Sequence, residues 1–378
     1  MDASVNRIPS SKDERTLLLA LRIGRDDIDE VNYSLEELKL LVKTAGAIIV
    51  DSKTLNRDKI DASFIIGKGF LAELSEYVDE NKIKLIVFDL NNIRPAQVRN
   101  LEEKLKCRVV GRNEVIMDIF ARRARSAEAK IEVELAQLRY ILPRLKGLGG
   151  VLSRLGGGIG TRGPGEKMLE TDRRHIQRKI ITLSKKLKNI QNHRERTRKS
   201  RKSELLGAVV GYTNAGKSTL INHLANDDLF VEDRLFATLE SYTRNVYLGE
   251  NKKCLLTDTV GFIRNLPANL IESFRSTLEE IDYSNFLIHV IDINSPDIET
   301  NILTVEKELN ELKCYNKPTL MFFNKSDLVE DESVLNLTYT RYPDSIIGSA
   351  YTGDGIPELK ARILHFHDTI KNRVSTAV

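Results

Sequence analysis

Two glycines five residues apart, followed at once by a lysine and a serine, constrain the fold of this chain more than any other feature. Gly211 and Gly216 frame the segment 211–218, which follows the apolar run LLGAVVG and opens the amphipathic pattern STLINHLAN. A strand, a GxxxxGK[ST] loop and a helix in this order aim successive backbone N–H groups and a helix N-terminus at phosphate oxygens. The motif predicts an α/β domain with a phosphate-binding loop (P-loop).

The predicted loop assigns roles to individual side chains. Lys217 would neutralise β- and γ-phosphate oxygens, and the Ser218 hydroxyl would ligate Mg²⁺. We expect nucleotide contacts along the whole segment, from Gly211, Tyr212, Thr213, Asn214, Ala215, Gly216, Lys217, Ser218 and Thr219. The loop alone does not identify the base.

A second segment, Asp258, Thr259, Val260 and Gly261, closes the strand pattern KCLLTDTV. An Asp at the carboxyl end of a strand can hold a water of Mg²⁺, and the glycine amide can face the γ-phosphate. Such a DxxG turn is common in proteins. Its value as evidence for a nucleotide site therefore depends on its position, after the P-loop and at the end of a strand. We predict that Lys217 and Gly261, together with Thr238 from the interval between them, are the catalytic residues.

Two further segments follow strand patterns and point to guanine. Asn324, Lys325, Ser326 and Asp327 close the run TLMFFNK, and the Asp327 carboxylate can accept the two N–H donors that guanine presents and adenine does not. After DSIIG, backbone N–H groups of Ser349, Ala350 and Tyr351 could meet the guanine carbonyl. Ligands of open α/β sheets bind at this edge, so the four segments together favour a guanine nucleotide.

Between the P-loop and Asp258 lies the interval in which a switch loop places a threonine hydroxyl on Mg²⁺. Thr238 is our first choice for this ligand and Thr243 the second, because spacing alone does not separate them. The neighbouring residues expected at the nucleotide are Phe236, Ala237, Leu239 and Glu240.

The sequence shows fewer of the residues that would carry out the reaction than of those that would bind the nucleotide. Phe262 stands just after the DxxG glycine, where many such enzymes place a Gln that orients the attacking water. Phenylalanine forms no such hydrogen bond, so we expect slow intrinsic turnover that a partner accelerates; the alternative is that another residue positions the water. Asn214 resembles the residue that helps hold a monovalent cation in potassium-dependent GTPases, which suggests stimulation by K⁺.

Charge is concentrated in the middle of the chain. Residues 121–202 carry 23 Lys and Arg against 7 Asp and Glu, a net charge of +16, and the other 296 residues carry −12. Such a segment is a candidate surface for a polyphosphate such as nucleic acid. The alternative is a solvated helix face, because Lys and Arg are good helix formers.

The same basic segment has the pattern of a helical hairpin. Nine of the 22 glycines fall within 147–165, between two apolar stripes of helical spacing. These stripes are Ile131, Leu135, Leu138 and Leu142, then Ile176, Ile180, Leu183, Leu187 and Ile190. Thr171 is a plausible N-cap for the second helix, and the polar stretch 192–203 would bridge to the next domain.

Residues 15–120 alternate short apolar runs with amphipathic patterns, which indicates a mostly parallel sheet. The expected strands are TLLLALR, AGAIIV, SFIIG, KLIVFD and CRVVG. We therefore predict an α/β fold in four parts: a flexible N-terminus over 1–14, an N-terminal α/β domain over 15–120, the basic hairpin over 121–202 and the P-loop domain over 203–378. The turn at Gly67, Lys68 and Gly69 is either structural or a second nucleotide site.

Composition excludes several classes of protein. Hydrophobic residues make up 41% of the chain, but no run approaches the roughly 18 apolar residues of a membrane span. The first residues show no apolar signal region, and three cysteines lie far apart. We expect a cytosolic protein with reduced thiols. No unaccounted apolar stripe demands a dimer, so we expect a monomer.

Several segments together resemble HflX-type GTPases, over about residues 15–370. The most specific are the glycine-rich run 156–166 and the run 169–174; the others are 64–69, 118–124, 134–138, 142–145 and 258–263. The resemblance implies a cytoplasmic GTP-binding protein that associates with the large ribosomal subunit and splits stalled ribosomes. It implies switch I at 236–240 with Thr238 on Mg²⁺. The basic segment would then face rRNA, with Arg154, Arg162, Arg173 and Arg174 as candidate contacts.

The chain departs from the family pattern in two places. The switch reads LESYTR over 239–244, without the family's proline and with Tyr242 in place of a threonine. Lys167 and Met168 replace the usual Thr-Gln after the glycine-rich run. Two other functions stay open: a GTP-dependent RNA-binding factor in ribosome assembly, and a regulator of a protein partner such as a membrane protease, which would bring peripheral association with a membrane.

Overall fold

The computed structural model describes residues 14–145, 164–199, 204–226, 235–239, 241–249, 251–264, 266, 275–314 and 316–375. The chain divides into two compact units, one of residues 1–189 with 267–273 and one of 190–266 with 274–378. The α/β fold class predicted from the sequence is confirmed, whereas the division into four parts stays a prediction.

The first unit contains a four-stranded parallel sheet in the order β2-β1-β3-β4. Its strands are β1 (Arg15–Ile23), β2 (Ile48–Arg57), β3 (Leu85–Phe88) and β4 (Arg108–Gly111). The run of buried residues in β1, Thr16 to Leu21, is nearly continuous because a central parallel strand is covered on both faces. The sequence prediction of a mostly parallel sheet is confirmed.

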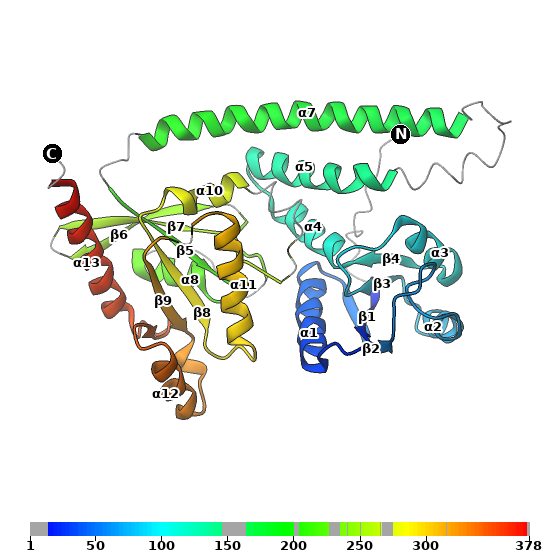
Figure 1. Ribbon diagram of the computed structural model, residues 1–378, viewed down its shortest axis with the longest axis horizontal. Helices are drawn as coiled ribbons and strands as arrows, with labels where there is room; N and C mark the ends of the chain where they lie inside the picture. The colour runs from blue at the N-terminus through cyan, green and yellow to red at the C-terminus, as the bar shows by residue number, and fades with distance from the viewer. Residues whose placement is uncertain are drawn as a thin grey trace. The chain divides into compact units, whose positions relative to one another are not determined.

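Helices cover this sheet on both faces (Figure 1). They are α1 (Ile28–Thr44), α2 (Lys68–Glu80), α3 (Pro95–Leu105) and α4 (Arg112–Arg123). One core joins the apolar sides of α2 and α3 to alternate residues of the strands, such as Leu17, Leu19 and Phe88. α1 contacts β1, β2 and α4.

The predicted strand SFIIG is wrong. Residues 63–67 form a turn with one isolated bridge between Asp61 and Ile65, and Ile65 has a φ of 67°, which an extended strand does not allow. The Asp61 carboxylate accepts the backbone N–H groups of Ser63 and Phe64, both at 2.8 Å. This side-chain turn competes with strand pairing and leaves Ile65 and Ile66 buried from a loop.

Two further helices, α5 (Ala127–Arg144) and α7 (Pro164–Lys199), carry the predicted stripes. Leu135, Leu138 and Leu183 form a buried cluster against which Ile131, Ile176, Ile180 and Leu187 pack. The pairing of the two stripes is therefore confirmed. Lys179 adds an ion pair to Glu134 at 2.5 Å.

α7 is longer at both ends than the sequence indicated. It begins at Pro164, so Thr171 lies inside the helix and is not its N-cap. Proline suits the first turn because its missing N–H needs no partner there. The helix also continues to Lys199, so most of the expected polar bridge 192–203 is helical. Lys, Arg, Glu and Gln sustain a helix without an apolar stripe.

The second unit is built on a six-stranded sheet in the order β10-β9-β8-β5-β7-β6 (Figure 1). Its strands are β5 (Leu205–Gly211), β6 (Tyr242–Gly249), β7 (Lys252–Asp258), β8 (Phe286–Asp292), β9 (Thr319–Asn324) and β10 (Ile346–Ile347). All neighbours are parallel except β6 and β7. The carboxyl ends of β5, β7, β8, β9 and β10 therefore meet at one edge.

Helices again flank the sheet. They are α8 (Lys217–Ala225), α10 (Arg275–Tyr283), α11 (Ile298–Glu311), η3 (Ser326–Leu328), α12 (Glu332–Arg341) and α13 (Ile356–Ser375). α8 and α13 share one buried core with β5 and β8, and α11 packs with β8 and β9 in another. Within the described ranges, none of the helices is long and apolar enough to cross a membrane.

A buried arginine organises the loops at the carboxyl edge of the first sheet. Arg112 is 1% exposed and lies at the start of α4. Its guanidinium pairs with Glu37, pairs with Asp89 at 3.0 Å and donates to Ser34. One cation thus serves two buried carboxylates from α1 and from the end of β3.

We expect Arg112→Ala to destabilise the protein by about 3–5 kcal/mol, because removing one partner leaves buried carboxylates without a counter-charge. Urea unfolding followed by circular dichroism measures this. The control is Lys104→Ala on exposed α3 surface, which should change the unfolding free energy by about 0.5 kcal/mol or less. Equal effects of the two variants would contradict the role given to Arg112.

Candidate nucleotide-binding site

The P-loop turns sharply at its two glycines. Gly216 has a φ of 92°, and a Cβ on it would lie 2.1 Å from Nδ2 of Asn324. Gly211 has a φ of 153°, and a Cβ there would lie 2.2 Å from the carbonyl oxygen of Val290. Only glycine fits both the backbone conformation and the space. The loop joins the end of β5 to the N-terminus of α8, as the motif predicts.

Lys217 is the buried cation of this loop. It is 6% exposed, and its ammonium donates to the carbonyl oxygens of Gly211 and Tyr212 at 3.2 and 2.8 Å. Burial lowers the pKa of Lys217 to about 8, against the opposing effect of the nearby Asp258. Among the described residues, this buried ammonium donates hydrogen bonds to carbonyl oxygens, and such a cation is well suited to an anionic ligand.

Three side-chain oxygens converge beside Lys217. The Ser218 hydroxyl lies 2.7 Å from the Thr238 hydroxyl, and each donates to Oδ2 of Asp258, at 2.6 and 2.8 Å. Neighbouring ligands of an octahedral Mg²⁺ lie about 2.9 Å apart, given metal–oxygen distances of about 2.0–2.1 Å. Thr243 instead shares a hydrogen bond with Thr257 between β6 and β7, so the structure brings Thr238 to this cluster and not Thr243.

Asp258 lies 5% exposed at the end of β7. Burial raises the pKa of its carboxyl, while hydrogen bonds from Ser218 and Thr238 and the charge of Lys217 oppose the rise. Its Oδ1 is buried without a well-aligned donor among the described residues, and so is the Thr213 hydroxyl. Buried polar atoms of this kind fit a site whose remaining partners are a ligand and its Mg²⁺.

The end of β9 is tied to the P-loop through Asn324. Its Nδ2 donates to the carbonyl of Ala215, and its Oδ1 accepts the backbone N–H of Ala350, both at 2.8 Å. Lys325 takes a left-handed φ of 67° and pairs with Asp292 at 2.7 Å. These bonds bring three of the predicted segments to one place at the carboxyl edge of the sheet.

Asp327 is exposed in η3, and no partner for its carboxylate is present in the described part of the chain. The loop after β10 is ordered by Ser349, whose Oγ accepts the N–H groups of Tyr351 and Thr352 at 3.2 and 3.1 Å. The Ala350 amide already donates to Asn324, and the Tyr351 side chain is 83% exposed. The expected contact of these amides with guanine stays a prediction.

Several other predicted residues have structural roles. The Thr259 hydroxyl donates to the Val209 carbonyl at 2.7 Å, and Val260 is buried. Phe236 and Leu239 bury their side chains, whereas Ala237 is exposed. Thr219, in α8, and Ser326, in η3, are half-buried; Asn214 is exposed with a φ of 62°. Glu240, Arg154 and Arg162 lie outside the described residues.

Three groups near this edge were not predicted from the sequence. Asp292, which ends β8, and Asn294 hold Lys325; a carboxylate at the end of a fifth strand pattern was a visible signal in the sequence. Arg264 pairs with Asp297 at 2.5 Å, a contact that no local pattern announces. His289 is buried in β8, where burial and the charge of Lys217 lower its pKa to about 4, so it is neutral.

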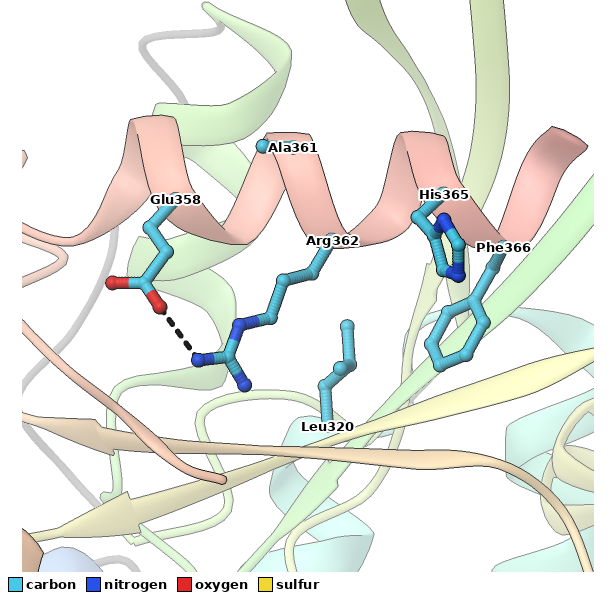
Figure 2. A pocket seen from close by; sticks show the side chains of 6 residues that line it. All are labelled: Leu320, Glu358, Ala361, Arg362, His365 and Phe366. Carbon is cyan, nitrogen blue, oxygen red and sulfur yellow. Dashed lines mark hydrogen bonds and ion pairs between the residues drawn. The ribbon is translucent and has the colours of Figure 1, made fainter. Parts of the chain in front are cut away.

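A pocket of about 330 Å³ lies away from these residues, between β9 and α13 (Figure 2). It is lined by Leu320, Glu358, Ala361, Arg362, His365 and Phe366. Figure 2 shows Arg362 turned toward Glu358, with which it pairs at 2.6 Å. None of the residues predicted to bind nucleotide lines it. The parts of the chain that the structure describes hold no cluster of three His, Cys, Asp or Glu suited to a metal.

Comparison with known families covers both units. Residues 32–121 match a GTP-binding GTPase N-terminal domain, 123–201 a GTP-binding GTPase middle region and 207–325 a 50S ribosome-binding GTPase domain. The chain is 45% identical to the GTPase HflX of Alkalihalophilus pseudofirmus, over 93% of this chain and 82% of the relative. The chain belongs to the HflX family of GTPases. The expectation of an enzyme of this class is thereby confirmed.

Other relatives agree with HflX membership. The GTPase HflX of Caldanaerobacter subterraneus is 48% identical, over 84% of this chain and 73% of the relative. Among solved structures, the complex of SsGBP with GDP is similar, with a TM-score of 0.51 and 25% identity over 94% of this chain and 99% of that one. The resemblance stated from the sequence is therefore confirmed at the level of the HflX family.

The lowered pKa of Lys217 makes nucleotide binding depend on pH. Above about pH 8 the free protein loses this proton, and an anionic ligand favours its return, so binding should take up protons. We expect guanine-nucleotide affinity to fall between about pH 7 and 8.5. Calorimetry in two buffers of different ionisation heat measures the uptake. Lys217→Arg, which stays charged throughout, should remove it; uptake that persists would contradict the assignment.

Proposed function

We propose that this chain binds GTP and GDP together with Mg²⁺ at the carboxyl edge of the second sheet. The observation that supports this best is the cluster of Ser218, Thr238 and Asp258 oxygens beside the buried Lys217. The P-loop amides would hold the phosphates, and Ser218 and Thr238 would be the direct ligands of the metal. Asp258 would hold a water of the metal, and Asp327 would read the base.

Hydrolysis in this proposal is an in-line attack of water on the γ-phosphorus, which breaks the bond to the β–γ bridging oxygen and releases GDP and phosphate. Bound Mg²⁺ would supply charge neutralisation. Lys217 would hold β- and γ-oxygens, and the Gly261 amide would donate to the γ-phosphate as negative charge develops. Phe262 is 2% exposed and cannot orient the water. Turnover of the isolated chain should therefore be slow and rise when a partner supplies the missing polar group.

The partner we propose is the large ribosomal subunit, with rescue or splitting of stalled ribosomes in the cytoplasm as the outcome. The match of 207–325 to a 50S ribosome-binding GTPase domain supports this. A second support is α7, whose exposed Arg and Lys residues would meet rRNA phosphates. These are Arg174, Arg178, Lys179, Lys185, Lys186 and Lys188. Arg173 is half-buried, and Arg174 pairs with Glu170 at 2.7 Å.

Two extensions of the proposal concern an ion and the assembly state. Asn214 is exposed in the P-loop, where its amide oxygen could hold K⁺ near the phosphates. Equal turnover in KCl and NaCl would remove this hypothesis.

We further propose that the chain acts as a monomer. Function in ribosome assembly, or regulation of a protein partner, is the alternative outcome of the ribosome experiment below.

Asp327→Asn should weaken GTP binding by at least tenfold and improve xanthosine triphosphate binding. The substituted amide presents a donor where guanine needs an acceptor, and xanthine offers a carbonyl there. Competition with a fluorescent guanine nucleotide measures both affinities. The control is Asp331→Asn. Asp331 is an exposed acid four residues further along the chain, and Asn can keep its role as an N-cap. Unchanged GTP affinity of Asp327→Asn would count against the base assignment.

GTP turnover with and without purified large subunits tests the ribosomal partner. We expect stimulation by large subunits, and loss of most of it when Arg178→Glu and Lys185→Glu are combined, because reversed charge repels rRNA phosphates. Lys307→Glu with Lys313→Glu, also exposed, is the matched control in the second unit. Association only with precursor particles would favour ribosome assembly. Full activity of the α7 variant would favour a protein partner.

A further inference from the structure

The segment that follows Gly261 is fastened to the P-loop by backbone pairing. The Thr213 N–H donates to the Phe262 carbonyl at 2.8 Å, and the Phe262 N–H donates to the Gly211 carbonyl at 3.1 Å. A third bond extends this pairing, because the Tyr212 hydroxyl accepts the backbone N–H of Arg264 at 2.9 Å. The two segments thus pair like short parallel strands, and the Tyr212 side chain of the P-loop makes the last contact of this pairing, with Arg264.

The Arg264 side chain continues the connection to α11. It is 7% exposed, and its Nη2 pairs with Oδ2 of Asp297 at 2.5 Å. Oδ1 of the same carboxylate accepts the Thr300 N–H at 3.2 Å and so caps α11. Although burial opposes it, hydrogen bonds from Thr300 and Arg264 lower the pKa of Asp297, so the carboxylate is charged at neutral pH. A charged pair of this kind fixes a loop firmly.

This fastening determines where Gly261 lies. A Cβ on Gly261 would be 2.9 Å from the Lys217 ammonium and 2.9 Å from Cα of Thr213, so its backbone lies directly against the P-loop. Phe262 and Ile263 are buried and hold the next residues inward. The position of the Gly261 amide relative to Lys217 therefore depends on the linked contacts from Tyr212 to Arg264 and from Arg264 to Asp297.

We propose that Tyr212, Arg264 and Asp297 are positioning residues that hold the Gly261 amide over Lys217 and thereby set how much more tightly the protein binds GTP than GDP. The inference rests on the proposed nucleotide function, in which only the γ-phosphate meets Gly261. GDP lacks that phosphate, so its affinity does not depend on the fastening. The three side chains act through Gly261, and Arg264 and Asp297 need not touch the nucleotide.

The test measures the affinities of a non-hydrolysable GTP analogue and of GDP, with Mg²⁺, for the full chain and its variants. Arg264→Gln and Asp297→Asn should each weaken the GTP analogue by about five- to tenfold, the factor expected for one buried hydrogen bond, and change GDP affinity by less than about twofold. Tyr212→Phe should likewise weaken binding of the GTP analogue. Arg264→Lys, which keeps the charge, should recover part of the loss. Tyr212→Phe combined with Arg264→Gln should lose less than the product of the single effects.

The matched control is Arg341→Gln, which removes an exposed ion pair to Glu299 in the first turn of the same α11. It should change neither affinity. Asp297→Asn keeps an N-cap residue and therefore tests the idea even if the Arg264 variants unfold. Variants that weaken both nucleotides equally, or bind the GTP analogue more tightly, would overturn the inference alone. A wild-type chain that bound neither nucleotide would overturn the proposed function and this inference with it.

Discussion

The burial of Lys217 beside Asp258 is the constraint on which the second unit depends. Taking an ammonium and a carboxylate out of water is costly, and the cost is tolerable only where hydrogen bonds and an opposite charge surround each group. Parallel β5 and β7 place both at the same sheet edge, and Ser218 and Thr238 supply the donors that Asp258 needs. The fold thus holds a charged site ready before a polyphosphate arrives.

Much of this arrangement could be predicted because its signals are local. The P-loop spacing fixes the turn between β5 and α8, and apolar runs such as those of β1 and β3 identify buried parallel strands. The stripes of α5 and α7 met as expected, since helical periodicity defines one face. The strand predicted at 63–67 was wrong because these residues are as hydrophobic as those of a strand, while hydrogen bonds to the Asp61 carboxylate direct the backbone into a turn.

Other features could not be read locally because they join residues far apart in the chain. Arg112 meets Glu37 and Asp89 only after α1, β3 and α4 have assembled. Arg264 meets Asp297 only when the segment after β7 packs against the start of α11. The choice of Thr238 over Thr243 likewise depended on the path of the chain and not on spacing. Proximity in the folded chain decides such contacts, and a single sequence contains little record of it.

The structure also separates two tasks that a glutamine after Gly261 would combine. Phe262 pairs through its backbone with Gly211 and Thr213 and buries its ring, so it fastens the loop but offers water no polar group. A chain built in this way can place the γ-phosphate donors well and still hydrolyse slowly, because holding charge and aligning water are distinct requirements. In the function proposed above, whatever aligns the water would control the rate, so turnover would depend on a partner, whereas discrimination between GTP and GDP would depend on this chain's own residues.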